Sequence, residues 1–164
     1  MTFDAADLLG GAAVADAVVR IREAVRPRRE GPGWATVELD RAEASFGVVP
    51  SPSAPAAPAA TRDGREDPDI RDDLLGAFAR LIRATDDREI ALLEPFTEGR
   101  LAAVLARHGE GFVALYLIAD SEAPAHARAA GLVLSAAASG PFGTQYLVVG
   151  GPHSGPFIIL AAAD

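Results

Sequence analysis

The pattern of apolar and polar residues is clearest in the second half of the chain. The run FVALYLIA, residues 112–119, is almost wholly apolar and follows a glycine turn, which is typical of a buried strand. Ahead of it, residues 99–109 carry apolar side chains at helical spacing and end at Gly109. This spacing and the terminal glycine predict a helix that leads into the strand.

Beyond this strand, the pattern predicts one helix and three further strands. The helix is expected at 122–131, the strands at 132–138, 144–151 and 157–163, and a turn at 139–143. From about residue 110 the order is therefore strand, helix, strand, strand, strand, which is one βαβββ module.

The first half of the chain gives a weaker version of the same order. A helix is expected from Val14 to Val25, and the alternation in GPGWATVELD predicts a strand from Trp34 to Asp40. Two apolar runs at 74–84 and 88–95, separated by the turn TDD, predict a hairpin. This half matches the module if its opening strand is the weak segment near Phe3.

Residues 50–73 differ in composition from the rest of the chain. PSPSAPAAPAA is rich in proline and alanine, and TRDGREDPDIRDD is charged and turn-forming, without the ligand spacing of a calcium-binding loop. We expect a mobile, solvated loop here. It lies within module one, at about 1–95, which is followed by a linking helix at about 99–109 and module two at about 110–164.

Length, charge and cysteine content restrict the function classes. The 164 residues fit a single domain, 1–164, and the formal net charge of -8 disfavours nucleic-acid and anionic-membrane partners, because phosphates require a basic surface. The absence of cysteine removes disulfides and thiolate chemistry. No secretory leader pattern and no apolar run near about 20 residues is present, so we expect a cytoplasmic protein.

The residues from about 88 to 163 resemble a known superfamily. REIALLEPFTEGRLAAVLARHGEGFVALYLIAD, followed by ARAAGLVL and GPFGTQYLVVGGPHSGPFIILAAA, is similar to the vicinal oxygen chelate proteins, which include the glyoxalases and bleomycin-resistance-like proteins. Within them, the chain looks most like the methylmalonyl-CoA epimerases and glyoxalase-like domains. The resemblance implies an α+β fold of paired βαβββ modules that form a half-open curled sheet, with a divergent first module here.

The metal ligands of that superfamily are missing from this chain. In metal-dependent members the ligands project inward from four strands, and the resemblance places three of them at Ala91, Ala114 and Ile159. A divalent metal needs several nitrogen or oxygen donors, which these side chains lack. A shift of one residue in the strand around Ala114 brings in other apolar side chains. We therefore expect no metal and no cofactor.

The resemblance and strand alternation together predict an interior pocket. Alternation identifies the residues that share a face with the three positions named above. Small-molecule sites usually combine an apolar lining with a few polar groups. The expected ligand-binding residues are Trp34, Thr36, Ala91, Ala114, Ile118, Tyr146, His153, Phe157 and Ile159.

Three side chains are candidates for catalysis. Glu38 or Glu89 would act as a general base in a dry pocket, and Tyr116 would donate a hydrogen bond to a developing oxyanion. Each also has a structural explanation: the glutamates at exposed strand positions, and the tyrosine in the core with its hydroxyl bonded to backbone. The sequence leaves these alternatives open.

Two functions from different classes follow. The first is a metal-independent protein that holds an apolar or aromatic small molecule, such as a natural product or pathway intermediate, in its barrel pocket. The alternative is a metal-free isomerase, epimerase or cyclase that acts on an acyl-thioester or polyketide-like substrate. A protein that uses its sheet for assembly is the least favoured, and a homodimer is compatible with all three.

Overall fold

The structure is a computed structural model, and the helices and strands that it describes lie between Glu43 and Ala162. The helix expected at 14–25 and the strand expected at 34–40 lie outside the described residues. No helix in the described part is long and apolar enough to cross a membrane. The structure describes residues 43–49, 61–62, 65–66, 69–83, 89–149 and 156–163.

Module two has the predicted order of a strand, a helix and further strands, but four strands follow the helix where three were expected. It begins with strand β7 (Gly111–Ala119) and helix α4 (Ala123–Ala129). Strands β8 (Val133–Leu134), β9 (Ala138–Gly140), β10 (Gly143–Val149) and β11 (Phe157–Ala162) follow. Strand β11 runs parallel to β7 and antiparallel to β10, so the last strand of the module returns to lie beside the first.

Module one has the same strand arrangement. It consists of β1 (Glu43–Val49), β4 (Ile70–Asp72), β5 (Ala77–Arg83) and β6 (Glu89–Pro95). Strands β5 and β6 form the predicted hairpin, and β6 returns parallel to β1. A small hairpin of β2 (Thr61–Arg62) and β3 (Arg65–Glu66) lies in the chain between β1 and β4.

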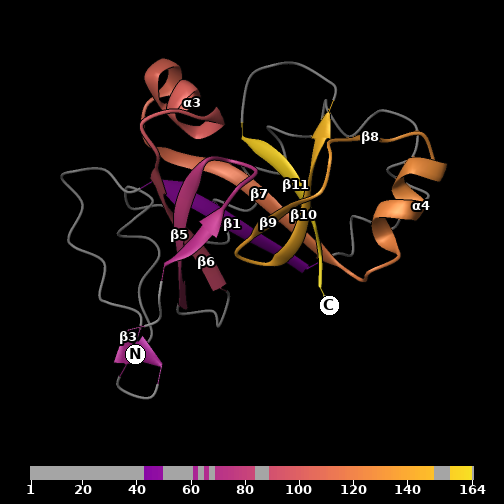
Figure 1. Ribbon diagram of the computed structural model, residues 1–164, viewed down its shortest axis with the longest axis horizontal. Helices are drawn as coiled ribbons and strands as arrows, with labels where there is room; N and C mark the ends of the chain where they lie inside the picture. The colour runs from indigo at the N-terminus through magenta and orange to yellow at the C-terminus, as the bar shows by residue number, and fades with distance from the viewer. Residues whose placement is uncertain are drawn as a thin grey trace.

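The two modules join through their first strands. Strands β1 and β7 are antiparallel, which gives the sheet order β4-β5-β6-β1-β7-β11-β10-β8, with β9 also paired to β10 (Figure 1). Helix α3 (Arg100–His108) connects the modules, as the 99–109 pattern predicts. The expected fold of paired modules in one curled sheet is confirmed by this strand order.

The sheet separates two apolar clusters. The outer cluster packs beneath α4, through Ala123 and Ala127. The inner cluster packs beneath α3, through the buried Leu101 and the half-buried Leu105. Alternation along β11 shows the division, because Ile158 belongs to the outer cluster and Ile159 to the inner one.

The sheet curls so that its two ends meet. The backbone N–H of Asp73, just after β4, donates a hydrogen bond to the carbonyl of Ser139 in β9, with an N···O distance of 3.0 Å. The side chain of Asp72 on β4 also accepts hydrogen bonds from Gln145 on β10, near the opposite end of the sheet, and from Tyr116 on the central strand β7. The inner cluster is therefore the interior of a nearly closed barrel.

Several expected elements differ from those in the structure. Strand β1, which pairs with β6 and β7, was not predicted, and the segment near Phe3 that was expected to open module one lies outside the described residues. The loop expected at 50–73 contains β4 at its end, where Asp72 is buried. The strand expected at 132–138 is reduced to β8, and part of the turn expected at 139–143 belongs to β9.

Candidate functional site in the barrel interior

The three interior positions inferred from the sequence lie together. Ala91 on β6, Ala114 on β7 and Ile159 on β11 all belong to the inner cluster and are fully buried. Gly47 on β1 lies among them, since a Cβ at this position would be 2.9 Å from the Cβ of Ala114. These four residues, which we call the floor of the interior, are therefore three very small residues and one isoleucine.

These side chains do not fit a metal ion. The positions at which the superfamily resemblance implies metal ligands hold hydrocarbon, which offers no lone pair to a cation. Across the described residues, no three or more histidines, aspartates or glutamates are grouped in a way that could hold a metal.

A buried polar cluster crosses the interior instead, and it was not predicted. Asp72 on β4 accepts hydrogen bonds from the hydroxyl of Tyr116 on Oδ2 and from the amide Nε2 of Gln145 on Oδ1, each at 2.9 Å. The backbone N–H of Leu75 also donates to Oδ1, at 2.9 Å. The side chains of Asp72, Tyr116 and Gln145, which we call the polar cluster, are fully buried.

Burial dominates the electrostatics of the polar cluster. Removal from water raises the pKa of Asp72 above its ordinary value of 3.8, against hydrogen bonds from Leu75, Gln145, Tyr116 and Leu74 that lower it. Burial raises the pKa of Tyr116 well above its usual range, and the neighbouring Asp72 carboxylate adds to this effect. Tyr116 therefore stays protonated as a hydrogen-bond donor at neutral pH.

Backbone and aromatic groups hold the polar cluster in place. The ring of Phe142 packs against that of Tyr116, with centroids 4.9 Å apart. The Gln145 side chain lies against Gly140, because a Cβ on that glycine would come within 2.1 Å of the amide group. The half-buried Leu105, Phe142, Leu147 and Phe157 form the outer boundary of the inner cluster.

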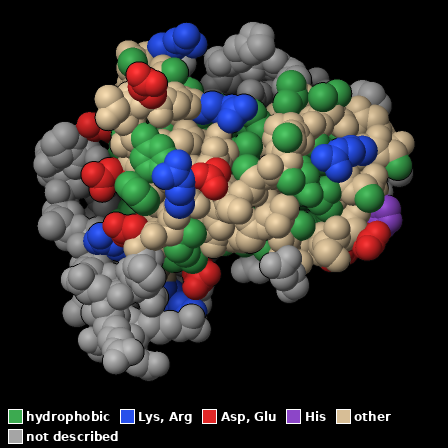
Figure 2. Space-filling view, viewed as in Figure 1, with side chains coloured by type: hydrophobic (Ala, Val, Ile, Leu, Met, Phe, Trp, Pro, Cys, Tyr) green, Lys and Arg blue, Asp and Glu red, His purple; other side chains and the backbone are tan. Residues whose placement is uncertain are grey.

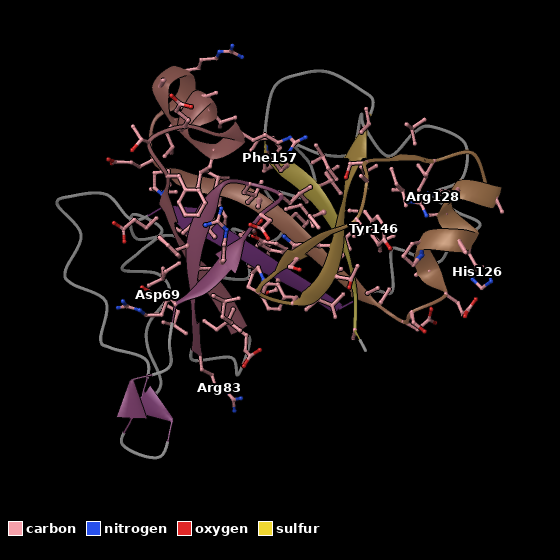
Figure 3. The ribbon with its side chains drawn as sticks, in the orientation of Figure 1. Asp69, Arg83, His126, Arg128, Tyr146 and Phe157 are labelled. Carbon is pink, nitrogen blue, oxygen red and sulfur yellow. The ribbon has the colours of Figure 1, made fainter. Side chains whose placement is uncertain are left out.

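The remaining candidates do not join this site. Glu89 is exposed at the start of β6, where its Oε1 lies 4.0 Å from Nη2 of Arg83. Tyr146 follows Gln145 along β10 and so points to the opposite face, where the guanidinium of Arg128 lies 5.0 Å from its ring centre. In Figure 3 the labels of Arg128 and Tyr146 lie on the α4 side of the sheet, and that of Phe157 lies on β11.

Five other candidates are not among the described residues of the inner cluster. Ile118 is half-buried near the end of β7 and is not part of the inner cluster. The other four, Trp34, Thr36, Glu38 and His153, lie outside the described residues.

Comparison with known proteins gives structural neighbours alone. No family model and no curated protein matches the chain. A methylmalonyl-CoA epimerase from Mycobacterium tuberculosis matches with 20% identity and a TM-score of 0.49, over 57% of this chain and 67% of that one.

Two further solved structures overlap to a similar extent. A methylmalonyl-CoA epimerase from Streptomyces coelicolor, in complex with 2-nitronate-propionyl-CoA, has 20% identity and a TM-score of 0.46, over 57% of this chain and 74% of its own. A hypothetical protein from Bacillus halodurans has 19% identity and a TM-score of 0.45, over 55% and 69%. These overlaps are partial, and the fold assignment rests on the strand order itself.

Proposed function

We propose that this protein binds an apolar or aromatic small molecule at the inner face of its barrel, without a metal. The observation that carries the proposal is the inner cluster itself, an apolar interior crossed by one polar cluster. Small-molecule sites typically have this composition, because apolar lining gives affinity and a few polar groups fix orientation. On the face seen in Figure 2, exposed apolar side chains form separate patches interrupted by charged groups.

The inner residues have distinct roles in this proposal. Ala91, Ala114 and Ile159 form the apolar surface against which the ligand packs. Phe142 and Phe157 are half-buried at the edge of the inner cluster, so in this proposal they are the rings that contact an entering ligand. The polar cluster supplies the hydrogen-bonding groups for orientation.

A titration with apolar probes tests this function. The dye 1-anilinonaphthalene-8-sulfonate and a panel of aromatic hydrocarbons, indoles and ketones are titrated into the protein and followed by fluorescence and calorimetry. Replacing Phe157→Ala should weaken binding about tenfold, since a contacting ring is worth about 1 kcal/mol or more. Phe78→Ala is the matched control, because Phe78 is exposed on the opposite face of β5. Absence of saturable binding across the panel would contradict the proposal.

The Asp72–Tyr116 pair favours a second function, a metal-free isomerase, epimerase or cyclase acting on an acyl-thioester or polyketide-like substrate. A buried carboxylate whose pKa is raised is a stronger base than an exposed one, and a tyrosine hydroxyl beside it can donate to a developing oxyanion. In this function Asp72 takes the role that the sequence pattern suggested for Glu38 or Glu89.

Proton exchange distinguishes the two functions. Acyl-thioesters such as acetoacetyl-CoA and methylmalonyl-CoA are incubated with the protein in D2O, and deuterium at the α-carbon is measured by mass spectrometry. An enzyme should lose exchange in Asp72→Asn and keep it in Glu89→Gln, the exposed control. A binding protein should show no exchange above the uncatalysed rate, in the wild type or in either variant.

A further inference from the structure

One buried atom of the polar cluster has no hydrogen-bond partner. Gln145 is fully buried, and its Nε2 donates a hydrogen bond to Asp72. Its Oε1 accepts no hydrogen bond, and among the described residues it is the single buried side-chain nitrogen or oxygen without a partner. Buried polar atoms in native proteins are almost always hydrogen-bonded, and an exception calls for a specific cause such as a bound ligand or water.

The orientation of the Gln145 amide is fixed by its surroundings. Oδ1 of Asp72 already accepts the backbone N–H of Leu75, so the group that faces it from Gln145 must be a donor. Rotating the amide by half a turn would place Oε1 against this carboxylate oxygen, oxygen to oxygen. The amide also lies against Gly140, where a Cβ would come within 2.1 Å of Nε2 and 2.3 Å of Oε1. Oε1 is therefore held as an acceptor and cannot exchange roles with Nε2.

Neighbouring groups do not supply the missing donor. The hydroxyl hydrogen of Tyr116 is directed to Oδ2 of Asp72. Asp72 itself, when ionised, has acceptor atoms alone. The polar cluster thus keeps one unpartnered acceptor, Oε1 of Gln145, while the Tyr116 hydroxyl and one N–H of the Gln145 amide point at the carboxylate.

We propose that Gln145 is the specificity-determining residue of the interior site, and that it selects an apolar or aromatic ligand bearing a hydroxyl or N–H group that donates to Oε1. This inference rests on the function proposed above. A ligand with an ether, ketone or carboxylate oxygen at the same point would place two acceptors together and be rejected. Because a site with a buried acceptor discriminates against partners that leave it unpaired, the preference should be about tenfold or more.

Three molecules of nearly equal shape test this selectivity. Indole carries an N–H, indene a CH2 and benzofuran an oxygen at the same ring position. Calorimetry should give the wild-type protein a dissociation constant for indole about tenfold lower than for indene, with benzofuran no tighter than indene. In Gln145→Met the ratio between indole and indene should fall to about one, whereas in Tyr146→Phe, the neighbour on the opposite face, the ratio should be unchanged.

A second measurement avoids dependence on the variant. In wild-type protein with labelled glutamine, the side-chain amide resonances of Gln145 should shift with indole and stay in place with indene. Equal affinity for all three molecules, or a ratio that survives Gln145→Met, would overturn the inference and leave apolar binding intact. Binding of none of them would overturn the proposed function and the inference together.

Discussion

Substitution of Asp72 by asparagine isolates the charge of the buried carboxylate. Asparagine has nearly the same shape, its Oδ1 can accept from the Leu75 N–H and from Gln145 Nε2, and its Nδ2 can donate to the Tyr116 oxygen in place of the present bond. The hydrogen-bond number is therefore kept, and the difference in stability between the two proteins reports ionisation.

The sign of the pH dependence follows from the direction of the pKa shift. Burial raises the pKa of Asp72 above 3.8, so the folded protein binds a proton at a pH where the unfolded chain has released it. The contribution of Asp72 to stability is complete below about pH 4 and is lost as pH rises through the folded pKa. A single proton limits the slope to about 1.4 kcal/mol per pH unit.

Urea unfolding of both proteins from pH 4 to pH 8 measures this effect. The free energy of unfolding of wild type minus that of Asp72→Asn should decrease as pH rises and level off above the folded pKa. A carboxylate whose pKa is lowered by its hydrogen bonds would give a nearly flat difference over this range, because its titration lies below about pH 4. A flat difference, or one that increases with pH, would refute the conclusion that burial dominates at Asp72.

Three further predictions address the barrel. Gly140→Ala should lower the free energy of unfolding by about 1–3 kcal/mol in the same urea assay, because the new Cβ must displace the Gln145 amide. The control Ser139→Ala, at an exposed neighbouring position, should change it by less than about 0.5 kcal/mol. Cysteines introduced by Asp73→Cys and Ser139→Cys should form a disulfide, since the chain has no other cysteine. Oxidation should raise the free energy of unfolding by up to about 4 kcal/mol, and reduction should remove this gain. No gain on oxidation would mean that the ends of the sheet do not meet. Dialysis against EDTA should leave the melting temperature and indole affinity unchanged, and a loss of either would point to a bound metal.

The sequence predicts the elements with strong periodicity and misses those stabilised by distant contacts. Strand β7 and helix α3 were located within a few residues, since one is almost continuously apolar and the other has a clear apolar stripe. Strand β1 was missed because its inner face carries Ser45 and Gly47, which give no hydrophobic alternation. Its burial comes from β6 and β7 on either side.

The same reason explains the part of the site that was missed. Asp72 lies in an acidic, turn-forming stretch that is typical of solvent-exposed chain, and its partners Tyr116 and Gln145 are 44 and 73 residues away. Tyr116 was identified, but its buried partner Asp72 was not. The sequence did carry a signal for Gln145, because a polar side chain stands there next to the apolar run YLVV of the same strand.

Methyl resonances of the protein saturated with indole test the interior site most directly. Alternation on β6 and β11 places adjacent residues on opposite faces. Ala91 and Ile159 belong to the inner cluster, and Ile90 and Ile158 belong to the outer cluster. We predict shifts and ligand cross-peaks at the methyls of Ala91, Ala114 and Ile159, with little change at the outer pair. Cross-peaks confined to Ile90 and Ile158, or to surface methyls, would contradict a ligand site inside the barrel.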